Sequence, residues 1–465
     1  MPFGVPATLC LSTSGLPGWL RRVDPFRPGP LPDGLSPAER VFFRTSLAWL
    51  VLLAALGVVS QVAQHWGLGR VESHFNLSTA GFDLITNSGF LGIFLCYGRL
   101  RTGWCDQARV VALGLLFEAV LWILRPPNWG LTGSLLTMGL GLGSAAALGL
   151  AAQAVLGGPQ VRTRARGYLV LAAFMMLFPH VTLWAHFAVI DWTPQVYDLF
   201  AYQVDGLAGF QPSFAVGALL EGSPVLLSLA MLVYNELPLL LFLALFLALD
   251  HPERAYNQVI SSFAGMGLAG FLLYNLYPAS GLVILFPETF PQGPAPPWDG
   301  LPHLLELPGT RNCMPSLHMS WILCLAFAVF RMGRRVRAAA LVVVGFTVLS
   351  TLYLGHYWID LVAAFPLALS FQALTASGLS WKAPARGQAL AGGLGMLGVA
   401  LVSLRWFHPW VVACPALTLG AQAGIILGSL LLEHRLARAA LNGPRNPARN
   451  PSVEVSDRLP RLAQT

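Results

Sequence analysis

The sequence predicts an all-α integral membrane protein with about 12 transmembrane helices. Of the 465 residues, 55% are hydrophobic and only 11% are charged, whereas an average soluble domain carries about 25% charged residues. Many apolar stretches approach the length of about 20 residues that crosses a bilayer. The basic residues fall between these stretches. The composition therefore excludes an ordinary soluble enzyme and a disordered chain.

The predicted spans follow one another from the N-terminal third to the C-terminal tail. Each is a mostly apolar stretch, and the second and third are the least apolar. We place them at 44–64, 80–98, 108–124, 132–156, 168–190, 224–249, 258–286, 315–331, 338–354, 356–376, 387–405 and 411–432.

The basic residues indicate the orientation of these spans. If the N-terminus is cytoplasmic and each span reverses the side, all but four of the 28 lysine and arginine residues lie inside, as the positive-inside rule requires. The four outside residues are Arg70, Arg125, Arg311 and Arg405. The net charge of +7 is therefore explained by topology, and no nucleic-acid partner is expected.

The chain divides by composition into membrane regions flanked by polar ends, without a soluble domain. The predicted parts are a cytoplasmic N-terminal segment (1–43), an additional four-helix region (44–157), a six-helix core (168–376), two additional helices (387–432) and a basic cytoplasmic tail (433–465).

The three longest outside segments are 65–79, 191–223 and 287–314. Segment 191–223 mixes aromatic, acidic and apolar residues, which predicts one or two interfacial helices. Segment 287–314 is rich in proline, which predicts an ordered or extended loop.

The cysteines give no sign of a metal site. They form no Cys-x-x-Cys pair and show no zinc-ligand spacing. We expect free thiols, no metal and no cofactor. The six are Cys10, Cys96, Cys105, Cys313, Cys324 and Cys414.

Two histidines are predicted to meet at the outer face. His318 lies where the outer loop enters the eighth span, and His356 lies at the outer turn between the ninth and tenth spans. One helix inward and one helix outward separate them, so topology alone returns both imidazoles to similar depth.

The neighbours of these histidines suit phosphoryl transfer. Asp360 follows His356 by one helical turn, and a carboxylate on one imidazole nitrogen leaves the other free to attack. Ser316, Asn312 and the first amides of the eighth span form a predicted anion site, and Arg311 offers a bidentate fork for phosphate.

The alternative is that these histidines have only a structural role. A single histidine near a helix end is most often a polar group reaching the interface. A catalytic role is favoured because five polar residues are predicted on the same face of the membrane. These are His318, His356, Asp360, Ser316 and Arg311.

Two motifs resemble a known family. Met-Pro-Ser-Leu-His at 314–318 and Leu-Tyr-Leu-Gly-His-Tyr-Trp-Ile-Asp at 352–360 resemble the second and third motifs of the type 2 phosphatidic acid phosphatase superfamily. The leucine at 317 and the His-Tyr-x-x-Asp ending are similar to its inositol phosphorylceramide synthase branch. The stretches 273–281 and 204–213 also resemble that branch, and the resemblance covers about 168–376.

The resemblance implies a role for each matching residue. His356 would be the nucleophile that forms a phosphohistidine, Asp360 would orient it, and His318 would protonate the leaving oxygen. Ser316 and nearby amides would hold the phosphate oxygens. The implied substrate-binding and phosphate-binding residues are Arg311, Ser316, Asn312, Tyr277 and Ser280.

The sequence departs from the family at its cationic positions. The only lysine is Lys382, which the topology places inside, and Ser350 stands where the third motif usually carries an arginine. With fewer cations, the site would bind a dianionic phosphate monoester less well. A phosphodiester headgroup carries less charge, so the departure favours a phosphotransferase over a phosphatase.

We therefore predict a metal-independent lipid phosphotransferase or lipid-phosphate phosphatase. Its partners would be the membrane and a lipid phosphate or phospholipid substrate, and its location a bacterial inner membrane with the site facing outward. The alternative is a transporter or a non-catalytic membrane scaffold. The sequence leaves the donor, the acceptor and the oligomeric state open.

Overall fold

A computed structural model describes residues 35–65, 84–124, 134–252, 254–255, 258–297 and 300–442. Within these ranges the protein has 17 α-helices and one two-stranded sheet, which confirms the predicted all-α fold class. Most of the predicted segment 1–43, nearly all of the loop 65–79 and most of the tail 433–465 lie outside the described residues.

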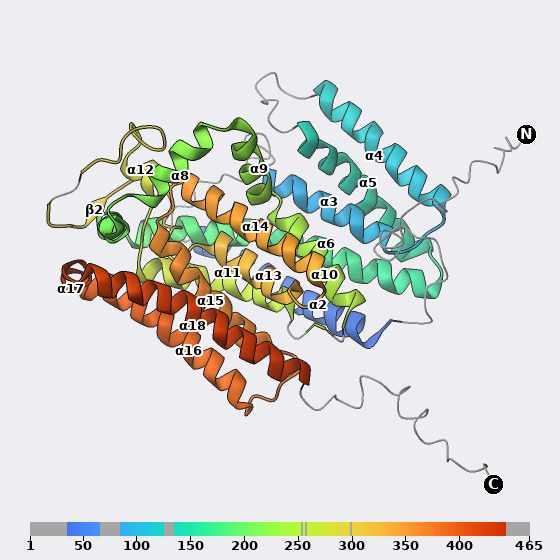
Figure 1. The fold of residues 1–465 in the computed structure, drawn as a ribbon. Coiled ribbons are helices and arrows are strands. Elements are labelled where there is room, and N and C mark those ends of the chain that lie inside the picture. Colours follow the sequence, from blue (N-terminus) through green and yellow to red (C-terminus); the bar gives the residue numbers. More distant parts are fainter. Residues whose placement is uncertain are drawn as a thin grey trace, which may run out of the picture.

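Helices α3, α4 and α5 form one side of the bundle, at the upper right of Figure 1. Helices α3 and α4 both pack on α5, and α2, α3 and α5 pack on α6. Glycines allow the close approach of α5, since a Cβ at Gly141 would lie 2.6 Å from the Gly114 carbonyl oxygen. The helices are α2 (Pro37–His65), α3 (Leu84–Gly98), α4 (Trp104–Leu124), α5 (Ser134–Leu156) and α6 (Pro159–Trp192).

The predicted interfacial segment 191–223 contains short helices, as expected. These are α7 (Asp198–Asp205), a 3-10 turn η3 (Gly206–Ala208) and α8 (Pro212–Glu221). The strand β1 (Gln195–Val196) precedes them and pairs antiparallel with β2 (Leu305–Glu306). The sheet ties this segment to the proline-rich loop before the eighth predicted span.

The predicted span 224–249 is divided into two helices. Helix α9 (Pro224–Asn235) is separated from α10 (Leu237–Asp250) by Glu236 alone, which caps both helices. Pro238 lies at the start of α10, where its missing N–H group breaks the continuous backbone ladder.

Helix α13 (Leu317–Val329) is the centre of the bundle. It packs against α10, α11 (Val259–Leu276), α14 (Arg334–Tyr353) and α15 (Trp358–Thr375). Every residue of α13 except His318 is buried, which is typical of a helix enclosed on all sides.

The last helices cover the opposite side of the bundle. Helices α16 (Pro384–Trp406) and α18 (Pro415–Asn442) pack on each other and on α15. The short helix α17 (His408–Ala413) connects them. Figure 1 shows α16 and α18 side by side, away from α4 and α5.

Each predicted span contains a helix, but fewer helices are full length. Among the described residues, seven are long and apolar enough to cross a membrane, or eight if α8 and α9, bent by 118°, count as one span. Helix α13 has only 13 residues, and α11 ends at Leu276 rather than 286 because Pro278 follows. Length and composition therefore support fewer full spans than twelve. The helices are α2, α5, α11, α14, α15, α16 and α18.

Short elements gather at one end of the bundle. Figure 1 shows α8, α12 (Leu282–Leu285), β2 and α17 at its left end. The turn between α14 and α15 is held at this end, because the Leu282 N–H donates to the Gly355 carbonyl at 2.7 Å. This turn carries His356.

Candidate active site

The structure brings His356 and Asp360 together. His356 is buried in the turn before α15, and its Nδ1 lies 3.4 Å from Oδ2 of Asp360 in the first turn of that helix. The same carboxylate oxygen accepts the Tyr357 N–H at 2.9 Å. The spacing of four residues therefore places the carboxylate against the ring, as the sequence predicts.

The second motif meets this pair through its backbone. Ser316 is the N-cap of α13, and its Oγ accepts the Met319 N–H at 3.4 Å. The Ser316 N–H donates to the Asp360 backbone carbonyl at 3.4 Å. The N-terminus of α13, where backbone donors and the helix dipole favour anions, therefore lies beside the first turn of α15.

His318 lies in the first turn of α13, in an aromatic setting. Its ring stacks on Tyr234 of α9, with the ring centroids 3.8 Å apart and the planes 10° apart. Trp321 packs edge-on against it at 5.9 Å. Tyr234 fixes the plane of the His318 ring, and no local pattern in the sequence connects Tyr234 with this motif.

The α7–α8 segment supplies three buried residues that sequence analysis did not select. The Asp205 carboxylate accepts the N–H groups of Trp358 at 2.5 Å and Ile359 at 3.1 Å. Ser213 Oγ donates to the His356 carbonyl at 2.6 Å. These bonds fix the turn that carries the histidine.

Asp198 is the third of these residues. Its Oδ1 accepts the Gly281 N–H at 2.6 Å and the Tyr357 hydroxyl at 2.8 Å, and its Oδ2 accepts the Ser280 N–H at 3.0 Å. One buried carboxylate therefore joins the loop after α11 to the residue next to His356.

Two glycines let these loops touch. Gly355 has φ +92° and Gly281 has φ +94°, backbone conformations that side chains rarely adopt. A Cβ at Gly355 would lie 2.8 Å from Val283 N, and a Cβ at Gly281 would lie 2.8 Å from the Gly355 carbonyl oxygen. Both positions need glycine for conformation and for space.

Arg311 is placed differently from the sequence prediction. Its side chain is 2% exposed, and its Nε, Nη1 and Nη2 donate five hydrogen bonds within the protein. A guanidinium has five N–H donors, so none is left to fork a phosphate in this arrangement. Arg311 instead fastens the two residues before β1 to the loop after β2. The acceptors are the carbonyls of Thr193, Pro194, Leu307 and Gly309, and Ser280 Oγ.

The other predicted binding residues also have protein partners. Ser280 Oγ accepts from Arg311 at 2.9 Å, and the buried Tyr277 hydroxyl donates to the Tyr197 carbonyl at 3.3 Å. Asn312 Oδ1 accepts from Thr310 Oγ1 at 3.1 Å. These residues support the loops around the His356 turn, and their contact with a substrate stays a prediction.

Burial controls the ionisation of the groups at this end. It lowers the pKa of His356 to about 4, opposed by a hydrogen bond to the Cys313 backbone. Burial also raises the pKa of Asp198, opposed first by the Ser280 and Gly281 amides. His356 is thus neutral at physiological pH, the form with a lone pair for attack.

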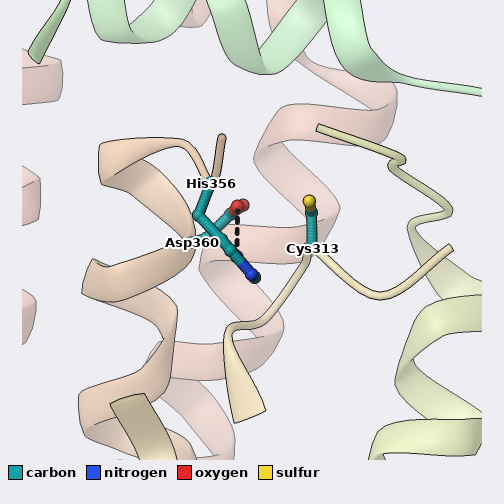
Figure 2. Close-up of side chains that lie close together, drawn as sticks. All are labelled: Cys313, His356 and Asp360. Carbon is teal, nitrogen blue, oxygen red and sulfur yellow. Dashed lines mark ion pairs between the residues drawn. The ribbon is translucent and has the colours of Figure 1, made fainter. Parts of the chain in front are cut away.

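Cys313 completes the surroundings of the histidine. Figure 2 shows its side chain close to those of His356 and Asp360. All three are buried, and one donor atom from each lies within 4.8 Å of the others. The Cys313 N–H donates to the Ala279 carbonyl at 3.2 Å, so the thiol is held against the loop that Asp198 fixes.

The comparisons with known proteins agree with the motifs. Residues 200–374 match the PAP2 superfamily, whose members are typically phosphatases. The matched range begins in α7 and ends in α15, so it contains the Asp205 cap as well as both motifs. No curated protein and no solved structure matches the chain. The match indicates phosphatase or phosphotransferase chemistry in a membrane setting.

Proposed function

We propose that the protein is a membrane-embedded lipid phosphotransferase or lipid-phosphate phosphatase that works through a phosphohistidine. The observation that carries this proposal is the buried pair of His356 and Asp360, 3.4 Å apart, within a segment that matches the PAP2 superfamily. In this proposal the predicted six-helix core 168–376 is the catalytic unit, and the additional helices 44–157 and 387–432 flank it.

The first step forms the phosphohistidine. A nitrogen of neutral His356 attacks the phosphorus, and the bond from phosphorus to the leaving oxygen breaks. The leaving oxygen takes a proton from His318. Asp360 orients the ring and stabilises the positive charge that develops on it.

The second step regenerates the histidine. An acceptor hydroxyl, or water, gives its proton to His318 and attacks the phosphorus, and the bond between phosphorus and His356 breaks. Because the two steps mirror each other, one residue serves as acid and then as base.

The phosphate oxygens would lie at the N-terminus of α13. Ser316 and the amides of the first turn offer donors, and the helix dipole favours an anion there. Arg311 does not take part in this proposal, since its donors are used within the protein.

The weak cationic character of the site bears on the choice of substrate. A phosphodiester carries one negative charge and needs less compensation than a dianionic monoester. This favours a phospholipid donor and headgroup transfer, as in the inositol phosphorylceramide synthase branch that the motifs resemble. The lipid tail would lie between helices, and the site would face the outer side of a bacterial inner membrane.

The test is turnover of a lipid panel in mixed micelles. Wild type and His356→Ala are compared, with free phosphate and new phospholipid measured separately. New phospholipid that depends on His356 identifies a transferase, and free phosphate identifies a phosphatase. The matched control is His303→Ala, since His303 is an exposed histidine in the proline-rich loop.

The intermediate is tested with donor labelled in its phosphate. Wild-type protein should acquire label that is labile in acid and stable in base, and His356→Ala should not. Equal turnover by wild type and a well-folded His356→Ala would exclude the proposal and favour a transporter or scaffold.

A further inference from the structure

Three metal-ligating side chains converge beside the proposed nucleophile. Cys313 precedes α13, whereas His356 and Asp360 come from the turn before α15 and its first helical turn. Figure 2 shows the three side chains close together, although Cys313 lies far from the other two in the sequence. No Cys-x-x-Cys pair marks this set in the sequence.

The distances approach those of a tetrahedral site. Zn²⁺ binds sulfur at about 2.3 Å and nitrogen or oxygen at about 2.0–2.2 Å, so neighbouring ligand atoms lie about 3.3–3.6 Å apart. His356 Nδ1 and Asp360 Oδ2 are already 3.4 Å apart. All three donor atoms lie within 4.8 Å of one another, so the thiol need move only by about 1 Å.

The backbone around the ligands is fixed in advance. The Cys313 N–H is bonded to the Ala279 carbonyl at 3.2 Å, and Asp198 holds the adjoining Gly281 amide at 2.6 Å. On the other side, Asp205 caps α15. Supporting interactions of this kind hold metal ligands in position and strengthen binding.

We propose that Cys313, His356 and Asp360 form an inhibitory site for a divalent ion of the zinc class. Thiolate, imidazole and carboxylate together suit Zn²⁺ and exclude Mg²⁺ and Ca²⁺, which prefer oxygen ligands only. With three protein ligands, the ion keeps an open position for water.

The chemistry of binding balances without a further reactant. Burial raises the pKa of the Cys313 thiol, so the thiol is protonated in the metal-free protein. The ion displaces that proton, which passes to solvent, and forms bonds to sulfur, nitrogen and oxygen.

Binding of the ion to either ring nitrogen of His356 would stop turnover. If the ion binds the attacking nitrogen, it occupies the lone pair that must reach phosphorus. If it binds the other nitrogen, it replaces the proton that Asp360 would hold and places positive charge on the ring. This inhibition rests on the proposed function, whereas metal binding itself does not.

The site is tested on full-length protein in detergent. Bound metal is first removed with a chelator, and the chelator is then removed. Co²⁺ serves as the probe, because a thiolate–cobalt bond gives a charge-transfer band in the near ultraviolet. We expect the band in wild type, its loss in Cys313→Ser, and its retention in Cys324→Ser. Cys324 is a matched control, since its buried sulfur contacts Gln372 instead.

Inhibition is measured with Zn²⁺ in the lipid assay. Cys313→Ser should turn over lipid without metal, and it should need at least about tenfold more Zn²⁺ for the same inhibition than wild type or Cys324→Ser. Unchanged sensitivity, or activation by Zn²⁺, would overturn the inhibitory site.

The two proposals fail in different ways. Absence of the cobalt band in wild type overturns the metal site even if turnover depends on His356. A band that requires Cys313, in protein without turnover, supports the metal site and counts against the proposed function. Even if Cys313→Ser does not fold, a wild-type spectrum without the band overturns the metal site.

Discussion

The Asp205 carboxylate caps the helix that begins at Trp358, by accepting the Trp358 N–H at 2.5 Å. It also accepts the Ile359 N–H at 3.1 Å. These are the first two amides of α15, which have no partner within the helix. Burial raises the pKa of Asp205, and its two hydrogen bonds to these amides oppose the shift. A residue of α7 thus fixes the start of the helix that carries Asp360.

Removal of this cap should lower both stability and turnover. Asp205→Ala leaves two amides unpaired, which costs about 1–3 kcal/mol for each buried group. Asp205→Asn keeps one acceptor oxygen and should give an intermediate loss. Thermal unfolding in detergent and the lipid assay measure the two effects.

Glu288→Gln is the control for the Asp205 variants. Glu288 is an exposed carboxylate, so its substitution should change the unfolding free energy by less than about 0.5 kcal/mol. Wild-type stability and turnover in Asp205→Ala would contradict the role of this cap.

Gly355 gives a second test of the His356 turn. In Gly355→Ala, the alanine would have to adopt the positive φ of 92°, and its Cβ would lie 2.8 Å from Val283 atoms. A left-handed backbone costs about 1–2 kcal/mol for a residue with a Cβ. We expect lower thermal stability and a lower kcat, because His356 follows directly.

Gly345→Ala is the matched control in α14. Nothing lies within 4 Å of a Cβ at Gly345, and alanine in a helix is favoured over glycine by about 0.5–1 kcal/mol. This variant should be as stable as wild type or more so, with unchanged turnover. The same loss in both variants would show that the effect of Gly355→Ala does not depend on the turn.

Arg311 should prove structural rather than substrate-binding. Arg311→Lys retains three donors for five acceptors, so stability should fall by at least about 2 kcal/mol. The KM of the folded fraction should stay close to that of wild type. A large rise in KM with unchanged thermal unfolding would instead assign Arg311 to the substrate.

The sequence could predict the parts of the site that are local. His356 and Asp360 are one helical turn apart, and Ser316 precedes an apolar helix, so motif and periodicity suffice for these residues. Asp198, Asp205 and Ser213 reach the same turn from more than 140 residues away. The spacing of residues along the chain does not connect them to the turn, because Asp205 and Ser213 bind its backbone groups and Asp198 binds the Tyr357 hydroxyl from distant positions in the sequence.

The contacts of Arg311 also depend on residues far away in the sequence. A lone arginine beside the motif suggests a phosphate ligand, but its acceptors are carbonyls of the segments around Thr193 and Leu307. Only the pairing of β1 with β2 brings these carbonyls together. The division of 224–249 at Glu236 is similar, since one proline changes a helix that hydropathy alone reads as continuous.

Activity should persist to unusually low pH. The neutral form of His356 attacks, and burial lowers its pKa from 6.5 to about 4. The attacking form is therefore retained as pH falls through 6.5 and is lost only near pH 4. The acid limb of kcat/KM, measured in buffer with EDTA, should have its midpoint near 4 rather than 6.5. Thermal unfolding at each pH separates titration from denaturation, and a midpoint near 6.5 in folded protein would contradict the neutral buried nucleophile.

The role of His318 predicts a dependence on the leaving group. If His318 protonates the leaving oxygen, His318→Ala should slow transfer from an alkyl phosphate donor by about 10²–10⁴-fold. Nitrophenolate leaves a nitrophenyl phosphate without protonation, so its release should fall much less. Tyr234→Leu keeps the imidazole but removes the ring stacked at 3.8 Å, and it should give a smaller loss with the same preference for the nitrophenyl donor. Equal losses for both donors in His318→Ala would assign His318 to binding or folding, because only an acid distinguishes leaving groups by their need for a proton.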